Sequence, residues 1–241
     1  MKRLDKILVE KSLVATRSQA ESYIKLGWVS VNGKMISKAG YLVGDNDEIK
    51  IKNSNQYVSR AALKLESVAE LLGLDFEYKN ILDVGSSTGG FTDFALKHGA
   101  SKVIAVDIGT EQLHPSLRND SRIELHEKTD IRHLNNIVPA PDIVLIDVSF
   151  ISVREVLPHV AGLVSQDTQI VAMVKPQFEA GAKDINKGVI KNDTVRRRIL
   201  HDFENWSKEL FIVSAKADSQ IAGAKGNLER FYLLKKAVLR G

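Results

Sequence analysis

The stretch between residues 81 and 107 is the feature that most constrains the fold of this chain. The apolar run Ile-Leu-Asp-Val-Gly (81–85) leads into a turn of small residues, Ser-Ser-Thr-Gly-Gly (86–90), and a helical pattern follows from Phe91 to His98. A second apolar run, Val-Ile-Ala-Val-Asp (103–107), ends in an acid. Strands that alternate with helices indicate an α/β domain with a mostly parallel sheet, and small residues after a strand let the backbone approach a ligand closely.

The same alternation continues along the chain, with further apolar strands expected at 123–126, 142–147, 168–175 and 230–234. Ahead of the first strand, Ser59 can cap a helix that Gly73 ends. The chain has 241 residues, of which 44% are hydrophobic, so it can bury a sizeable core. We therefore predict a Rossmann-like α/β domain that forms most of the chain.

The acids of this domain point to a nucleoside cofactor. Asp107 lies 22 residues after Gly85, where an acid can bind ribose hydroxyls, and this suits NAD, FAD or S-adenosylmethionine. The turn lacks the G-x-G-x-x-G spacing of a pyrophosphate cradle, whereas Asp83 places a carboxylate where a cationic methionine group could be received. Asp130, after the strand at 123–126, could accept the adenine amine. We therefore predict S-adenosylmethionine, although each acid alone could simply cap the next helix or turn. The candidate cofactor-binding residues are Asp83, Gly85, Ser86, Ser87, Gly89, Gly90, Asp107, Ile108 and Asp130.

Four charged residues form a candidate catalytic set. Asp147 and Lys175 each end a strand and should reach the same edge of the sheet, while Lys64 precedes the sheet and Glu229 opens the strand at 230–234. Methyl transfer to a ribose 2′-hydroxyl needs a base, and a lysine can serve where burial and cationic neighbours lower its pKa. We predict Lys175 as that base, Lys64 as the neighbouring charge, and the two acids as groups that orient the ammonium groups and bind the sugar. The nearby acids favour the charged form of lysine, and the sequence leaves open whether this effect or the lowering of the pKa by burial and cationic neighbours is larger. Either lysine alone is equally well explained as a surface residue.

Other acceptor atoms are disfavoured by what the sequence lacks. The chain has no cysteine, so no thiolate can form the covalent adduct that methylation at pyrimidine C5 uses, and no thiolate metal site is expected. The strand that ends at Asp147 continues as Val-Ser-Phe-Ile-Ser, without the Asp/Asn-Pro-Pro-aromatic turn of amino-methylating enzymes. An oxygen acceptor remains.

The first quarter of the chain carries the net positive charge. Through Arg60 there are 11 Lys and Arg against 6 Asp and Glu, and the remainder has 23 against 24. Such a segment favours an anionic partner such as nucleic acid, with an ordinary basic surface as an equal alternative. Helical spacing predicts two helices, the second opened by a capping box at Thr16 and ended by Gly27, and Asn32-Gly33 predicts a type I′ hairpin before a last strand at 48–51.

This order, with Arg-Leu-Asp (3–5), Thr-Arg-Ser-Gln-Ala (16–20) and Val-Asn-Gly (31–33), resembles the S4-type RNA-binding domain, a small α+β domain. The resemblance covers residues 1–52, and we assign 53–60 to a linker and 61–241 to the catalytic domain. It implies contacts to the phosphates and sugars of structured RNA, which anchor without reading much sequence. The residues implied in these contacts are Arg3, Arg17, Ser18, Lys25 and Lys34.

The whole chain resembles the TlyA family, named for hemolysin A or for ribosomal RNA 2′-O-methylation, with a catalytic domain of the FtsJ/RrmJ type. The matching motifs are residues 82–93, 106–109, 147–152, Val-Lys-Pro-Gln-Phe-Glu (174–179) and Lys-Gly-Asn-Leu-Glu (225–229). The resemblance implies that Lys64, Asp147, Lys175 and Glu229 form the catalytic tetrad, and that the substrate is cytidine ribose in small-subunit and sometimes also large-subunit ribosomal RNA. The sequence departs from the family pattern at two positions. Members of the family often have Asn at the position of Asp130, and they often have a proline before the lysine that corresponds to Lys225.

Two other interpretations remain. The hemolysin name suggests a membrane-lytic protein, but no run of residues reaches the roughly 18 apolar positions of a membrane span. A non-catalytic factor that binds ribosomal RNA or ribosomal subunits is the third. The N-terminal residues lack the apolar core of a secretory signal, so we expect a soluble cytoplasmic protein.

Overall fold

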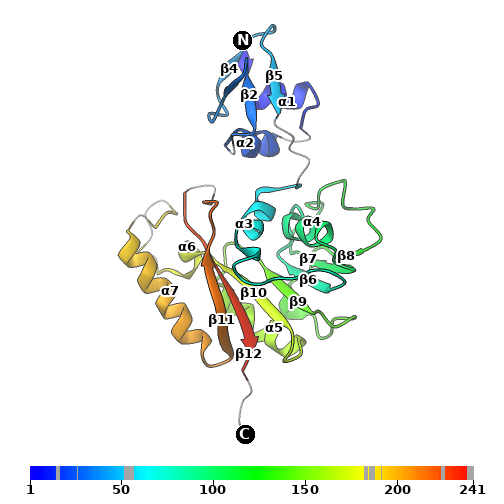
Figure 1. Ribbon diagram of the computed structural model, residues 1–241, viewed down its shortest axis with the longest axis vertical. Coiled ribbons are helices and arrows are strands. Elements are labelled where there is room, and N and C mark those ends of the chain that lie inside the picture. Colours follow the sequence, from blue (N-terminus) through cyan, green and yellow to red (C-terminus); the bar gives the residue numbers. More distant parts are fainter. Residues whose placement is uncertain are drawn as a thin grey trace. The chain divides into compact units, whose positions relative to one another are not determined.

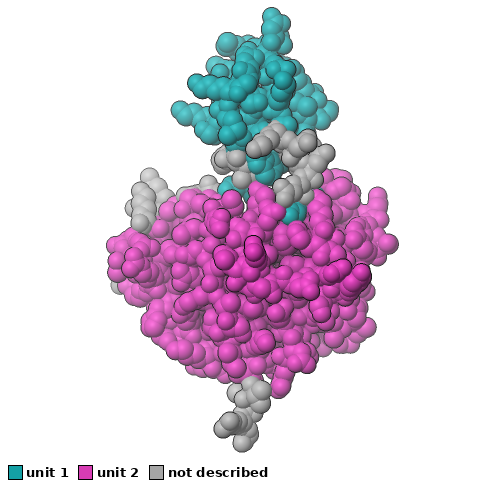
Figure 2. All heavy atoms as spheres, in the orientation of Figure 1, with its two compact units in different colours: residues 1–60 teal, residues 61–241 magenta. Residues whose placement is uncertain are grey.

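The chain folds into two compact units, Met1–Arg60 and Ala61–Gly241, which are coloured separately in Figure 2. The computed structural model describes residues 1–14, 17–25, 27–51, 57–181, 184, 188–190, 192–223 and 226–237. Thr16, at the start of the expected capping box, and residues 53–56 of the expected linker lie outside the described residues.

The first unit combines two helices with short antiparallel strands. Its helices are α1 (Leu4–Glu10) and α2 (Arg17–Lys25). One sheet has the order β3 (Lys34–Met35), β2 (Val29–Val31), β5 (Ile49–Ile51), and a second pairs β1 (Lys2–Arg3) with β4 (Leu42–Val43). Asn32 and Gly33 have φ values of 51° and 77°, so the hairpin turn between β2 and β3 uses the conformation that this dipeptide favours. The short strands β1 and β4 were not predicted from the sequence.

The second unit is built on a mixed seven-stranded sheet with the order β11-β12-β10-β9-β6-β7-β8 (Figure 1). Its strands are β6 (Asn80–Val84), β7 (Lys102–Val106), β8 (Ile123–His126), β9 (Ile143–Ile146), β10 (Gln169–Val174), β11 (Phe211–Asp218) and β12 (Arg230–Lys236). Its helices are α3 (Arg60–Ala69), α4 (Gly90–Lys97), α5 (Leu157–Leu163), α6 (Pro176–Glu179) and α7 (Asp193–Ser207), with 3₁₀ turns η1 (Ile131–His133) and η2 (Val153–Glu155). Helices α5 and α7 and strand β11 were not among the elements predicted from the sequence.

Alternating side chains of the buried strands pack on the two faces of this sheet. On one face, Leu82 and Val84 of β6 join a large apolar cluster that includes Leu157 of α5 and Phe203 of α7. On the other face, Asp83 bonds to Thr92 of α4. The buried runs on parallel strands read as continuous apolar sequence because both faces are covered.

The last strand of the sheet lies between two strands that precede it in the sequence. β12 pairs antiparallel with both β10 and β11, whereas β10, β9, β6, β7 and β8 pair in parallel. The antiparallel pairing brings the start of β12 to the C-terminal end of β10, with Arg230 opposite Val174. The predicted Rossmann-like fold is confirmed, with this antiparallel edge added.

Candidate active site

The register of the sheet gathers the predicted strand-end residues along one edge. Val84 pairs with both Val106 and Ile146, so Gly85, Asp107 and Asp147 follow at the same level of three adjacent strands. On the other side, Lys175 directly follows β10 and Glu229 directly precedes β12, at the paired ends of these two strands. In parallel strands this C-terminal edge is where ligands bind in open α/β sheets.

The four predicted catalytic residues form two close ion pairs. The Nζ atom of Lys175 lies 2.5 Å from a carboxylate oxygen of Asp147, and the Lys175 side chain is 9% exposed. The Nζ atom of Lys64 lies 2.6 Å from Glu229, whose side chain is 4% exposed. Lys64 of helix α3 therefore lies at the same edge of the sheet as Asp147, Lys175 and Glu229, which stand at the ends of β9, β10 and β12. Whether these residues catalyse a reaction stays a prediction.

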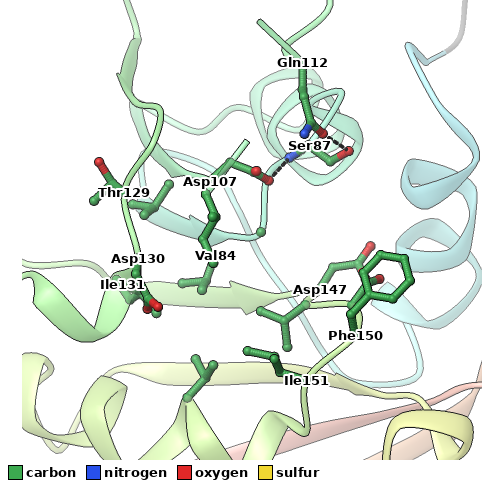
Figure 3. Close-up of a pocket in the computed structure, with 16 residues that line it drawn as sticks. Val84, Ser87, Asp107, Gln112, Thr129, Asp130, Ile131, Asp147, Phe150 and Ile151 are labelled. Atoms are coloured by element: carbon green, nitrogen blue, oxygen red, sulfur yellow. Dashed lines mark hydrogen bonds between the residues drawn. The ribbon is translucent and has the colours of Figure 1, made fainter. Parts of the chain in front are cut away.

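A cavity of about 410 Å³ opens beside this set (Figure 3). It is lined by polar groups from the ends of β6, β7 and β9, among them Ser87, Asp107 and Asp147, and by the apolar side chains of Ile108 and Ile131. In Figure 3, Asp130 and Phe150 lie toward opposite ends of the view. Asp147 lines the cavity and pairs with Lys175, so only the side chain of Asp147 separates the lysine from a ligand bound in the cavity.

Asp107 is held by backbone groups on both sides. The backbone N–H groups of Ser87 and Gly109 donate to its two carboxylate oxygens, at 2.7 Å and 2.6 Å. The Ser87 hydroxyl also donates to the side-chain carbonyl of Gln112, at 3.2 Å. A carboxylate can accept about four hydrogen bonds, so Asp107 keeps capacity for two ligand hydroxyls in a fixed orientation.

Asp83 lies beneath the glycine turn and does not line the cavity. Its carboxylate is fully buried and accepts hydrogen bonds from the N–H and the hydroxyl of Thr92, at 2.9 Å and 2.6 Å. Its other oxygen has no hydrogen-bond partner among the described residues, and the same holds for the buried hydroxyl of Ser86. Burial raises the pKa of Asp83 to about 7, and the nearby carboxylates of Asp147 and Asp107 add to this effect.

Asp130 lines the cavity and also caps η1. Its carboxylate accepts from the backbone N–H of Arg132 at 2.9 Å and pairs with the guanidinium of the same residue at 2.7 Å. This hydrogen bonding lowers the pKa of Asp130 to about 2, so the group is ionised at neutral pH. The alternative that the acid caps a turn is therefore true of Asp130, and its place in the cavity wall leaves the cofactor role open to test.

The glycine turn packs closely against its neighbours. Gly85 has a φ of 81°, and a Cβ atom there would come within 2.6 Å of the carbonyl oxygen of Asp147. Gly89 has a φ of 87°, and a Cβ there would meet the side chains of Leu113 and Leu117 at 2.6 Å. Both positions have the left-handed conformation that favours glycine, and at Gly85 the neighbouring atoms belong to the backbone, so a side chain there would have no space. The next glycine, Gly90, is buried at the start of α4.

Sequence reasoning missed three residues of this region. Ser149 accepts a hydrogen bond from Lys175 at 2.6 Å, and Gln112 lines the cavity beside Asp107. Phe150 also lines the cavity, is 90% exposed, and has a φ of 71°, which is unusual for a bulky residue. Its ring contacts that of Phe178, with centroids 5.5 Å apart. The only available signal concerned Phe150, an aromatic residue three positions after the strand-end acid Asp147.

In the first unit, a buried acid holds two of the predicted RNA-binding residues. Asp5 is fully buried and pairs with Arg3 at 2.9 Å and with Arg17 at 2.8 Å. The arginine side chains remain 43% and 52% exposed, so their outer nitrogens can reach a ligand. Lys34 is exposed, whereas the side chains of Ser18 and Lys25 lie outside the described part of the structure.

The described residues offer neither a metal site nor a helix suited to a membrane. No cluster of His, Asp or Glu side chains in the described ranges could hold a metal ion. Within those same ranges, no helix combines the length and the apolar character needed to cross a membrane.

The fold and the acids at its sheet edge define a Rossmann-like methyltransferase domain that follows a small α+β unit. Comparison with known proteins agrees. Residues 57–237 match the family of FtsJ-like methyltransferases, and residues 2–49 match the S4 domain.

Relatives of high similarity extend over both units. Hemolysin A of Brachyspira hyodysenteriae is 38% identical over 94% of this chain and 97% of its own length. The 16S/23S rRNA (cytidine-2′-O)-methyltransferase TlyA of Mycobacterium tuberculosis is 37% identical over 97% of this chain and 89% of its own. A solved structure from Streptococcus thermophilus, assigned as a hemolysin, superimposes with a TM-score of 0.77 at 36% identity, covering 98% of this chain and 88% of that one. The chain belongs to the TlyA and hemolysin A family of FtsJ-like methyltransferases.

Proposed function

We propose that this protein transfers a methyl group from S-adenosylmethionine to the ribose 2′-hydroxyl of cytidine in ribosomal RNA of the small subunit, with the large subunit as a second candidate substrate. The observation that carries the proposal is the pair of buried lysine–carboxylate contacts at the edge of a nucleoside-sized cavity. The names of the relatives support the substrate, since one is a 16S/23S rRNA (cytidine-2′-O)-methyltransferase. Ribosomal RNA as substrate would place the protein in the cytoplasm.

The residues around the cavity fit S-adenosylmethionine. Asp107 is oriented by two backbone N–H groups and can accept the ribose hydroxyls. Ile108 and Ile131 offer apolar surface for the adenine, and Asp130 offers an acceptor for its amine. The unpartnered buried oxygen of Asp83 lies behind the turn formed by Gly85, Ser86, Ser87, Gly89 and Gly90, and a cationic methionine group bound there would favour the ionised form of this carboxyl group. We assign to the cofactor site the nine residues predicted from the sequence, which are Asp83, Gly85, Ser86, Ser87, Gly89, Gly90, Asp107, Ile108 and Asp130.

When bound, S-adenosylmethionine supplies an activated methyl group. The protein must then remove the proton from the acceptor hydroxyl, and we assign this role to the Nζ atom of Lys175. Asp147, at 2.5 Å, stabilises the ammonium group that results. Lys64, held by Glu229 at 2.6 Å, adds positive charge near the developing alkoxide, and the two acids also offer acceptors to the sugar.

The first unit anchors the RNA in this proposal. The guanidinium groups of Arg3 and Arg17 are both held by the buried carboxylate of Asp5. Guanidinium groups bind phosphate oxygens through two parallel hydrogen bonds. We retain Ser18, Lys25 and Lys34 as further contacts on the basis of the S4 match alone. Phosphate contacts of this kind position the substrate, and the choice of nucleotide then depends on the second unit.

The test is methyl transfer from labelled S-adenosylmethionine to separated ribosomal subunits, followed by mapping of the modified nucleotide. Lys175→Ala should lower the rate by about 10²- to 10⁴-fold while cofactor binding persists, because the base is lost and Asp107 is untouched. Lys208→Ala, at an exposed lysine of the same unit, is the matched control. Unchanged transfer by Lys175→Ala would disprove the assignment of the base.

Two outcomes would point to the other interpretations. Tight binding of ribosomal RNA by the wild-type protein without any methyl transfer would indicate a non-catalytic assembly factor. Leakage of liposomes caused equally by the wild-type protein and by Lys175→Ala would indicate a membrane activity that the methyltransferase site does not explain.

A further inference from the structure

The carboxylate of Glu179, outside the cavity, connects the two segments that carry Asp147 and Lys175. Glu179 is the last residue of α6, the short helix that follows Lys175. Its side chain is 1% exposed. It is not among the residues that line the cavity, so no contact with the cofactor is expected. A buried carboxylate is costly to desolvate, and it persists only where strong hydrogen bonds compensate it.

Those hydrogen bonds all come from the segment that follows Asp147. The hydroxyl of Ser152 donates to one oxygen of Glu179 at 2.6 Å, and the backbone N–H of Val153 donates to the other at 2.8 Å. The guanidinium of Arg154 lies 3.4 Å away and rests over the ring of Trp206 in α7, 5.6 Å from its centroid. The carboxylate of Glu179 therefore interacts with three consecutive residues, Ser152, Val153 and Arg154.

The same two segments meet at two more points, both closer to the predicted reaction centre. Lys175 contacts Asp147 and donates to Ser149, and the ring of Phe150 contacts the ring of Phe178. Between these contacts the segment passes through Phe150 in a left-handed conformation, which is energetically costly for a non-glycine residue. A segment with this cost keeps its shape only if its ends are held firmly. Asp147 holds one end, and Glu179 holds the other.

We propose that Glu179 is a positioning residue whose carboxylate holds residues 148–153 in the shape that places Asp147 and Ser149 around the ammonium group of Lys175. The effect on catalysis rests on the proposed function, whereas the effect on the segment does not. Glu179 acts through Ser152 and Val153 and does not touch the reacting atoms.

The activity test compares Glu179→Ala, Glu179→Gln and Glu155→Gln. Glu155 lies in the same segment with a side chain that is 57% exposed, so it controls for loss of a nearby charge. Glu179→Ala should lower kcat by about 10- to 100-fold per folded molecule, the scale expected for misplaced catalytic groups, and should lower cofactor affinity by less. Glu179→Gln keeps an acceptor for the N–H of Val153 and should recover part of kcat. Glu155→Gln should behave as wild type.

Ser152→Ala tests whether Glu179 acts through the proposed contact. If it does, adding Ser152→Ala to Glu179→Ala should change kcat by less than about two-fold, because both substitutions remove the same hydrogen bond. Single effects that multiply in the double variant would overturn the proposal. So would a Glu179→Ala protein that melts earlier but keeps the wild-type kcat, since this is the result of a purely structural role.

Amide hydrogen exchange gives a readout that needs no substrate. Exchange at Val153 and Arg154 should accelerate in Glu179→Ala and stay unchanged in Glu155→Gln, because these amides donate to Glu179 and to the hydroxyl of Ser152. If the wild-type protein transfers no methyl group, the proposed function fails while this measurement still decides the role of Glu179. Unaltered exchange in Glu179→Ala would refute the inference.

Discussion

A methyl group added at Gly85 tests whether the close approach of two strands builds the site. Gly85 follows β6 with a φ of 81°, and a Cβ atom there would lie 2.6 Å from the carbonyl oxygen and 3.1 Å from the carbonyl carbon of Asp147. Both atoms belong to the backbone, so no side-chain rotation can relieve the contact. Gly85→Ala should therefore displace the segment that carries Asp147.

The magnitude has two parts. The left-handed conformation costs a non-glycine residue about 1 to 2 kcal/mol, and forcing an extra carbon into a packed region costs about 1 to 3 kcal/mol. The free energy of unfolding of Gly85→Ala should fall by about 2 to 5 kcal/mol. For a domain of this size, each kcal/mol shifts Tm by about 2 to 4 °C, so a decrease of roughly 4 to 20 °C is expected.

Gly73→Ala is the matched control. Gly73 has a φ of 64°, but a Cβ atom there has no other atom within 4 Å. Its substitution should cost only the conformational part, about 1 to 2 kcal/mol. Thermal unfolding compares stability, and calorimetric titration with S-adenosylmethionine compares affinity, which should fall for Gly85→Ala and stay unchanged for Gly73→Ala. Equal melting temperatures for both variants, or normal cofactor affinity in Gly85→Ala, would refute this reasoning.

Three further substitutions or conditions have defined outcomes. Asp107→Ala should weaken cofactor binding by about 10- to 100-fold in a titration, because hydrogen bonds to a charged group contribute about 1.5 to 3 kcal/mol; unchanged affinity would remove Asp107 from the site. The hydrogen bond from Arg3, followed by that from Arg17, keeps the pKa of Asp5 at about 2 despite burial. Because the folded pKa lies below the ordinary value of 3.8, the first unit should lose stability as the pH falls from about 4 to 2, measured by Trp28 fluorescence in a Trp206→Phe background, and a flat profile would contradict this. Arg17→Ala should weaken RNA binding and reduce its salt dependence, and an unaltered salt slope would exclude a phosphate contact.

Local patterns in the sequence were sufficient for most of the parallel sheet and for the hairpin of the first unit. The apolar runs at 81–85 and 103–107 became β6 and β7, and Asn32-Gly33 became the turn between β2 and β3. Strand β11, at an edge of the sheet, alternates between more and less exposed residues. Helix α7 buries Ile199, Leu200 and Phe203 at helical spacing. Both elements therefore have a sequence pattern from which they could have been predicted. The antiparallel position of β12 between β10 and β11 has no local sequence pattern, because strand pairing is decided by residues far apart in the sequence.

The site divides in a similar way. Strand-end acids could be predicted because parallel strands end together, and Asp107, Asp147 and Lys175 do meet at one edge. The direction of a side chain depends on its face of the sheet, and Asp83 turns toward α4 rather than into the cavity. Partners supplied by loops, such as Ser149, depend on tertiary packing and were missed.

The position of β12 has a consequence for the synthesis of the protein. β12 fills the space between β10 and β11 and follows both of them along the chain, so these two strands lack their shared neighbour on the ribosome until residues 230–236 have emerged from the exit tunnel. Glu229 and its contact with Lys64 form at the same late moment, joining residues 165 positions apart. A nascent chain that has not yet exposed residue 229 therefore lacks both antiparallel pairings of β12 and the contact between Lys64 and Glu229, and these parts of the structure are completed together.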